Sequence, residues 1–162
     1  MADPQGFTAQ LDREIARLKA KGARVRMTPT VRLNGTSDLA WENRGLMARH
    51  PEVQFYDYTK SVARMRRYLS NRMPRNYHLT FSRSETNEAD TLSILRDGGT
   101  VAAVFSTKRG RPLPLQWRGF PVLDGDRSDL RFLDPRGFVV GLRAKGKARG
   151  AAHGFVVKAK EA

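Results

Sequence analysis

The chain has 162 residues and no cysteine, and its 30 lysine and arginine residues against 16 aspartate and glutamate residues give a net charge of +14. The length predicts a single domain (1–162), and the lack of cysteine excludes disulfides, thiolate nucleophiles and cysteine-held iron–sulfur clusters. No apolar run reaches the roughly 18 residues of a membrane span, and the first residues lack the apolar stretch of a secretory signal. We therefore expect a cytoplasmic protein with no membrane partner. The positive charge favours nucleic acid or a nucleoprotein as its partner.

The chain begins with a predicted amphipathic helix over residues 7–21, because Phe7, Leu11, Ile15 and Leu18 recur at helical spacing. Strands and helices then alternate in a predicted core, residues 24–106. Repeated strand–helix–strand units predict an α/β fold with a parallel sheet, either an open sheet or a partial TIM-type barrel. Strands are expected at residues 24–33, 53–58, 77–81 and 100–105, and helices at residues 38–49, 61–71 and 87–96.

The remaining residues, 107–162, predict a basic C-terminal segment of loops and short strands. A turn is expected at residues 124–126, where Asp-Gly-Asp follows a short apolar stretch. Short strands are expected at residues 138–142 and 155–157, with a basic, glycine-bearing loop over residues 143–150 between them.

Polar side chains follow the predicted strands at their carboxyl ends, where parallel α/β folds collect ligand sites. One interpretation is catalytic, with Asp57 or Asp124 as general base beside Tyr58. The alternative is structural, with the tyrosines packed, Asp57 paired to a basic neighbour and the hydroxyls capping helices. On the first interpretation, the residues holding a ligand or its phosphate would be Asn34, Ser37, Asp38, Lys60, Ser82 and Arg83.

Four aspartates in the basic C-terminal segment are candidates for a cation site. Asp124, Asp126, Asp129 and Asp134 carry the oxygen ligands that Mg²⁺ prefers. Turn formation and pairing with neighbouring arginines is the commoner explanation for such a cluster. The three histidines, at positions 50, 78 and 153, form no metal-binding motif. No metal site is therefore predicted, and magnesium is the one cofactor that the sequence leaves open.

Two basic segments are candidates for contact with nucleic acid, although a solvated charged face is the alternative for each. Because no recognition helix or aromatic sheet signature is present, we expect contact with the phosphate backbone and weak sequence specificity. The first segment spans a predicted helix and its exit, with Arg64, Arg67, Arg72 and Arg75, and the second is the loop with Lys145, Lys147 and Arg149.

Five motifs cover most of residues 30–157: TSDLAWE (36–42), VQFYDYTK (53–60), NYHLTFSRSE (76–85), LDGDRSDLRFLDP (123–135) and VGLRAKGK (140–147). With these motifs the chain resembles a group of short phage- and plasmid-borne proteins of unassigned function. Around the tyrosine–threonine–basic strand end it is distantly similar to longer proteins of the mycobacteriophage gene-product-eighty-eight type, which carry a cysteine-rich N-terminal part suggestive of a radical-SAM-like partial barrel. The resemblance implies a partial-barrel fold and an origin in a mobile element of a bacterial host. Without cysteine, the cluster chemistry is excluded here.

Three functional hypotheses are compatible with these features. The first is a mobile-element accessory protein that binds nucleic acid or a nucleoprotein, in replication or against host defence. The second is a small enzyme acting on a nucleotide or another phosphorylated ligand at the strand ends. The third is a catalytically inactive remnant of an enzyme fold that binds a protein partner. A half barrel would also need its open edge strands covered, either by a homodimer or by residues 7–21 and 138–157.

Overall fold

The computed structural model describes residues 4–150 and 154–158, and their strands form an eight-stranded, mostly parallel sheet. The strand order is β1-β2-β3-β4-β7-β6-β5, and β8 also pairs with β4. All pairs are parallel except the β5–β6 hairpin. The strands are β1 (Thr30–Val31), β2 (Gln54–Thr59), β3 (Tyr77–Ser82), β4 (Val101–Phe105), β5 (Gln116–Trp117), β6 (Phe120–Asp124), β7 (Val139–Arg143) and β8 (Val156–Val157).

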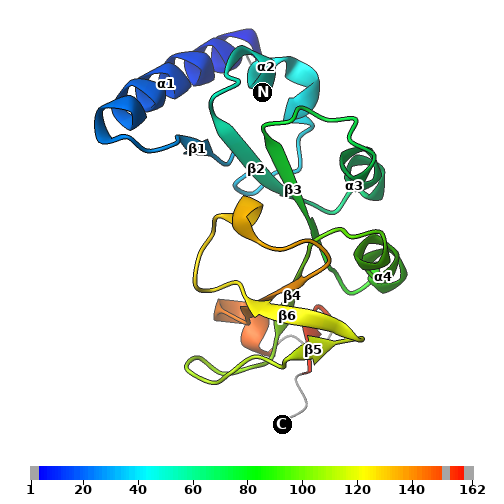
Figure 1. Ribbon diagram of the computed structural model, residues 1–162. Helices are drawn as coiled ribbons and strands as arrows, with labels where there is room; N and C mark the ends of the chain where they lie inside the picture. Colours follow the sequence, from blue (N-terminus) through cyan, green and yellow to red (C-terminus); the bar gives the residue numbers. More distant parts are fainter. Residues whose placement is uncertain (1–3, 151–153, 159–162) are drawn as a thin grey trace.

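Helices lie on one face of this sheet, and the connection between β6 and β7 lies on the other (Figure 1). The helices α3 (Val62–Leu69) and α4 (Glu88–Arg96) pack side by side on the first face, while α1 (Pro4–Val25) lies beyond β1. Short helical turns complete the chain: η1 (Trp41–Arg44), α2 (Leu46–Arg49), η2 (Arg131–Leu133) and η3 (Gly146–Gly150). None of the described helices is long and apolar enough to cross a membrane.

The core forms where alternate residues of the strands meet α3 and α4. Phe81 pairs with Val101, and Val101 pairs with Val139, so these three side chains form one row across the sheet. All three are fully buried, as is Met65 of α3. Burial of each such side chain stabilises the fold by roughly 1.5–3 kcal/mol. Gly99 at the entry to β4 lets the chain pass close to α4, because a Cβ there would lie 2.5 Å from Ile94 Cγ2.

The opposite face of the sheet is more polar and is covered by the connection between β6 and β7. Tyr56, Tyr58 and His78 point to this side, since they alternate with the core residues of β2 and β3. The ring of Phe132 in η2 lies 5.7 Å from that of Tyr56, and Arg131 is only 1% exposed against β3. The segment with η2 therefore takes the place of a second helical layer over β2 and β3.

The mostly parallel α/β sheet and the strands near residues 53–58, 77–81 and 100–105 agree with the sequence predictions, as do the helices that follow the first two of these strands. The predicted helix over residues 38–49 is wrong, because the chain there forms only η1 and α2. The reason is Asn34, whose Oδ1 accepts hydrogen bonds from the Leu39 backbone N–H (3.0 Å) and Trp41 Nε1 (3.2 Å) and holds the loop in a non-helical path. The predicted strand over residues 24–33 shortens to β1, since α1 runs on to Val25. His153 lies outside the described residues.

Candidate functional site

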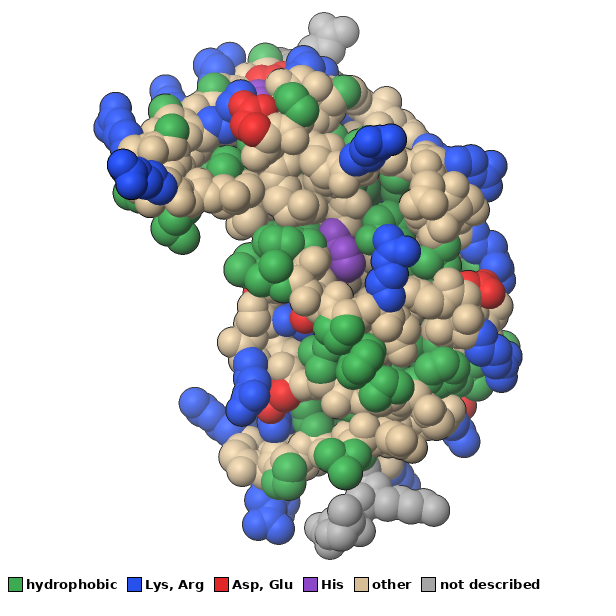
Figure 2. All heavy atoms as spheres, in the orientation of Figure 1, with side chains coloured by type: hydrophobic (Ala, Val, Ile, Leu, Met, Phe, Trp, Pro, Cys, Tyr) green, Lys and Arg blue, Asp and Glu red, His purple; other side chains and the backbone are tan. Residues whose placement is uncertain are grey.

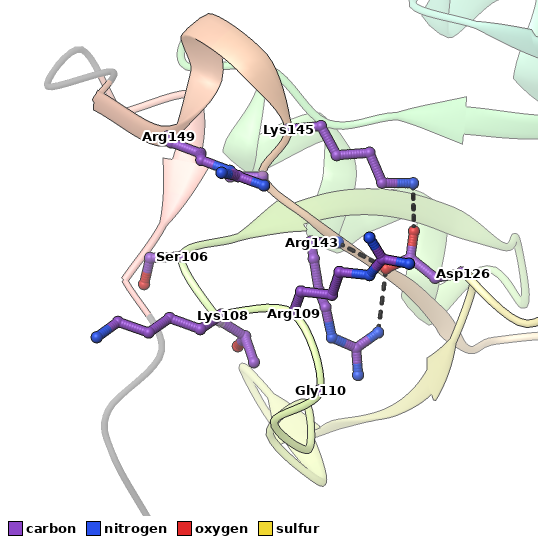
Figure 3. Close-up of a pocket in the computed structure, with 10 residues that line it drawn as sticks. Ser106, Lys108, Arg109, Gly110, Asp126, Arg143, Lys145 and Arg149 are labelled. Carbon is purple, nitrogen blue, oxygen red and sulfur yellow. Dashed lines mark hydrogen bonds and ion pairs between the residues drawn. The ribbon is translucent and has the colours of Figure 1, made fainter.

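A pocket with a volume of about 910 Å³ lies at the carboxyl ends of β4, β6 and β7 (Figure 3). These three strands are parallel and β7 lies between the other two, so the loops that leave them converge on the same edge of the sheet. Carboxyl ends of parallel strands are the usual place for a ligand site in α/β folds. The lining residues come from these loops and from η3: Ser106, Thr107, Lys108, Arg109, Gly110, Asp126, Arg143, Ala144, Lys145 and Arg149.

Two of the five cations that line the pocket are held by aspartates. Arg143 at the end of β7 forms a bidentate ion pair with Asp124, with Nη1–Oδ1 at 2.8 Å and Nη2–Oδ2 at 2.9 Å. Asp126 receives Lys145 Nζ at 2.8 Å and Arg143 Nη1 at 3.0 Å. The Arg143–Asp124 pair makes this wall of the pocket rigid, because bidentate arginine–carboxylate pairs fix geometry as well as charge.

The carboxylates of this wall are held in their charged form. The hydrogen bond from Arg143 keeps the pKa of Asp124 below its ordinary value. Burial acts to raise the pKa of Asp126, but the hydrogen bonds from Lys145 and Arg143 outweigh it and the pKa is lowered. Both aspartates therefore remain anionic at neutral pH, and the pocket still has an excess of positive charge.

The other three cations, Lys108, Arg109 and Arg149, are exposed, and their side chains make no hydrogen bond or ion pair with another described residue. Figure 3 shows the Lys108 side chain pointing away from Asp126. The hydroxyl oxygen of Thr107 is buried and also has no hydrogen-bond partner within the part of the chain that the structure describes. The pocket thus offers an anionic ligand three cations whose side chains have no partner among the described residues.

The predicted site at the ends of β1 and β2 is a buried hydrogen-bond network. Asp57 is fully buried, its Oδ1 accepts the Asn34 backbone N–H at 2.8 Å, and its Oδ2 accepts the Tyr77 hydroxyl at 3.1 Å. Burial raises the pKa of Asp57 to about 6. Because neither oxygen faces an open space, the structure does not support Asp57 as a general base, and the structural alternative fits its contacts.

Arg64, expected to contact phosphate, belongs to the same network. The side chain is 7% exposed overall and pairs with Glu42 through Nε at 3.0 Å and Nη2 at 2.9 Å. Its Nη1 contacts Asp38, and Nη2 also donates to the Tyr77 hydroxyl at 2.9 Å. With its donors engaged inside the fold, the Arg64 guanidinium is not placed to receive a phosphate.

The other residues expected near these strand ends hold the loop that follows β1. Asp38 Oδ2 accepts the Thr59 hydroxyl at 3.0 Å and the backbone N–H of Lys60 at 2.8 Å, while the Ser37 hydroxyl donates to Asn34 at 2.8 Å. The Lys60 residue itself is exposed. Asn34, Ser37 and Asp38 therefore lie together, as predicted, but their contacts are with the protein.

Tyr56 and Tyr58 share one side of the sheet and Asp57 takes the other. Both hydroxyls donate to Asp129, at 3.4 and 3.3 Å, and the Arg32 guanidinium lies 4.9 Å from the centre of the Tyr58 ring. Burial raises the pKa of Tyr58 to about 12, so the phenol remains protonated at neutral pH. Asp129 is the aspartate that contacts these tyrosines, whereas Asp124 belongs to the wall of the basic pocket.

At the end of β3, Arg83 is also engaged within the fold. Its Nη1 donates to the carbonyl oxygens of Gly154 at 2.7 Å and Phe155 at 2.8 Å, and the residue is 8% exposed. Arg83 therefore holds the segment that leads into β8, and Ser82 beside it is half-buried. This arrangement differs from the expected phosphate contact.

The two predicted basic segments lie in different places, and only the second one lines the pocket. On and after α3, Arg67 donates to Asn43 at 3.3 Å, while Arg72 and Arg75 are exposed. In the C-terminal segment, Lys145 and Arg149 line the pocket, and Lys147 is exposed in η3 between them. Sequence reasoning missed three of the lining cations, namely Lys108, Arg109 and Arg143. A signal was present for two of them, since they follow directly after the apolar strand over residues 100–105.

Among the described residues, no group of three or more histidine, cysteine, aspartate or glutamate side chains is arranged to hold a metal ion. No curated protein and no solved structure matches the chain. A family model described as Gene product 88 matches residues 1–159, and the chain therefore belongs to this family. The resemblance to the gene-product-eighty-eight type is thereby confirmed.

Proposed function

We propose that this member of the Gene product 88 family is a mobile-element accessory protein that binds nucleic acid, alone or within a nucleoprotein, through phosphate groups at the basic pocket. The observation that carries the proposal is the set of three cations, Lys108, Arg109 and Arg149, that line the pocket without a partner among the described residues. The net charge of +14 acts in the same direction, since it raises the local concentration of any polyanion.

The chemistry of the pocket favours the backbone of nucleic acid over its bases. The lining residues include no aromatic side chain on which a base would stack. Cations on flexible side chains recognise phosphate as charge and carry little sequence information. We therefore expect binding that depends steeply on salt and weakly on sequence.

Fluorescence anisotropy with labelled single-stranded DNA, duplex DNA and RNA across a salt series tests this proposal. The pocket variant is Lys108→Ala/Arg109→Ala, and the matched control is Arg13→Ala/Arg17→Ala, which removes the same charge from exposed positions of α1. We expect the pocket variant to weaken binding to all sequences and to flatten the single-strand salt slope by about 1.4, or about 0.7 for each lost phosphate contact. Equal weakening by the control, or negligible binding of the wild type at physiological salt, would refute the proposal.

A second candidate ligand is a nucleotide or another small phosphorylated molecule. The volume of about 910 Å³ favours it, because small-molecule pockets usually span roughly 300–1,000 Å³. On this reading Asp126 is the acid that lines the pocket, since Asp57 is buried and Asp124 is paired with Arg143. A thermal shift with nucleotides that is lost in the Lys108→Ala/Arg109→Ala variant, together with weak binding to longer strands, would favour this candidate.

We also propose that the open sheet is a partial barrel. In support, β1 to β4 are sequential parallel neighbours, with α3 and α4 on one face and a polar, covered second face. This is the arrangement of successive units in a (β/α)₈ barrel. On this proposal the basic pocket lies at the carboxyl end of the barrel fragment, and the protein acts in the cytoplasm of a bacterial host.

A further inference from the structure

One acidic side chain lies among the cations of the basic pocket, and its contacts divide into a fixed part and a replaceable part. Asp126 Oδ2 accepts the Arg143 backbone N–H at 3.1 Å and Arg143 Nη1 at 3.0 Å, while Oδ1 accepts Lys145 Nζ at 2.8 Å. The Asp126 side chain is 19% exposed, whereas the Lys145 side chain is 77% exposed. The carboxylate is therefore held on the wall of the pocket, and Lys145 is the partner that is free to leave it (Figure 3).

The Lys145–Asp126 pair lowers the affinity of the pocket for a ligand with a single negative charge. A phosphodiester has one negative charge, as the Asp126 carboxylate does, so transferring Lys145 from the carboxylate to a phosphodiester exchanges one similar contact for another. A phosphomonoester carries close to two charges at neutral pH and has three strong acceptor oxygens. It can take Lys145 and engage other groups at the same time.

The pocket contains cations that can pair with the additional charge and oxygens of a phosphomonoester. Arg109 and Arg149 have no partner among the described residues, so their charge is not neutralised by the fold. A phosphomonoester has enough charge and enough oxygens to pair with Lys145 and with one of these arginines at the same time.

We infer that Asp126 is an internal counter-ion that a ligand must displace from Lys145, and that it makes the pocket select phosphomonoester groups over internal phosphodiesters. This inference rests on the proposed function and gives it a preferred substrate class, a terminal phosphate. The phosphate at the 5′ end of a nucleic acid strand and the phosphate of a nucleotide share this chemistry.

The test compares two single-stranded DNA molecules of one sequence, labelled at the 3′ end, one with a 5′-phosphate and one with a 5′-hydroxyl. The variant is Asp126→Asn, which removes the charge but keeps an oxygen for the Arg143 backbone N–H. The matched control is Asp97→Asn, because Asp97 is an exposed aspartate paired with Arg66 at 3.2 Å outside the pocket. Both substitutions change the net charge equally.

We expect the wild type to bind the 5′-phosphorylated strand about tenfold more tightly, the factor of one charge-assisted hydrogen bond. Asp126→Asn should bind the 5′-hydroxyl strand more tightly than the wild type does, because the carboxylate no longer competes with the strand for Lys145. The preference of this variant for the 5′-phosphorylated strand should therefore fall to about twofold. Asp97→Asn should keep the preference of the wild type. A nucleoside 5′-monophosphate that displaces the strand at concentrations near the dissociation constant of the strand would support selection of a phosphomonoester and indicate a free nucleotide as the ligand. If the nucleotide does not compete, the ligand is the phosphorylated end of a strand.

Equal binding of the two strands by the wild type would overturn the inference, and this result does not depend on any variant folding. An unchanged preference in Asp126→Asn would overturn the role of Asp126. These failures are distinct from failure of the proposed function. If both strands bind equally but lose affinity in Lys108→Ala/Arg109→Ala, the nucleic-acid proposal holds and only the selectivity is wrong; if neither strand binds the wild type, both are wrong.

Discussion

Asp57 offers a direct test of the buried network, because replacing it with asparagine removes a charge that the fold holds out of water. The residue is fully buried between Asn34 and Tyr77. Burial raises its pKa from the ordinary value of 3.8 to about 6. The asparagine variant retains an oxygen for the Asn34 N–H and has no ionisation in this range. Any difference in pH dependence between the wild type and Asp57→Asn is therefore due to this carboxyl group.

The sign and size of the effect follow from proton linkage. The folded state holds the proton of Asp57 more tightly than the unfolded chain does, so the contribution of this group to stability is full below pH 3.8 and is lost as the pH rises through 6. Two pKa units correspond to about 3 kcal/mol in total, of which about 2 kcal/mol falls between pH 4 and pH 6. The free energy of unfolding of the wild type should fall by this amount relative to the variant.

Urea unfolding of the wild type and Asp57→Asn at pH 4, 5, 6 and 7 measures this difference. Asp97→Asn is the matched control, because it makes the same substitution at an exposed aspartate outside the buried network. A difference between wild type and Asp57→Asn that stays constant from pH 4 to pH 7 would refute the reasoning. A wild type that gains stability with rising pH relative to the variant would show that Arg64 and the hydrogen bonds outweigh burial.

Further predictions concern the remaining buried groups. Arg64→Ala should lower the free energy of unfolding by about 3–5 kcal/mol, because it leaves the buried Glu42 carboxylate without its partner. The exposed Arg66→Ala should cost less than about 1 kcal/mol in the same urea titration. Gly99→Ala should lower the thermal midpoint through a loss of about 1–3 kcal/mol, since a Cβ would overlap α4, and an unchanged midpoint would contradict this packing. Burial lowers the pKa of His78 to about 4, so its imidazole should stay neutral in NMR titration from pH 8 to pH 5, and a midpoint near 6.5 would contradict its burial.

The regular part of the sheet was predictable because its strands are short segments rich in aromatic and aliphatic residues, and amphipathic helices separate them. Residues 53–58, 77–81 and 100–105 carry this pattern, and the structure has β2, β3 and β4 there. The error over residues 38–49 has a specific cause, since the Asn34 side chain replaces helical hydrogen bonds with its own. The spacing of apolar residues predicts which face of such a segment is buried. It does not show that a side chain several residues earlier forms hydrogen bonds with the segment in place of the helical ones.

The candidate site was harder to predict because its parts come from strands that are not neighbours in the sequence. Placement of β7 between β4 and β6 brings Lys108, Asp126 and Lys145 to one pocket. No local pattern indicates that order. The same limit explains Arg64, whose place in a run of basic residues suggested an exposed surface. Its burial depends on Asp38, in the loop after β1, and on Glu42 of η1, both well before α3.

The shared edge of β4 has a consequence for synthesis of the protein on the ribosome. One side of β4 pairs with β3 at its start and with β8 at its end, so this edge is complete only after residues 156–157 have been made. At roughly 5–20 residues per second, the intervening 50 or so residues take about 3–10 s to synthesise. During that interval the nascent chain presents an unpaired, apolar strand end that is able to pair with another chain. A chaperone would limit this exposure, and docking of the segment held by Arg83 would end it.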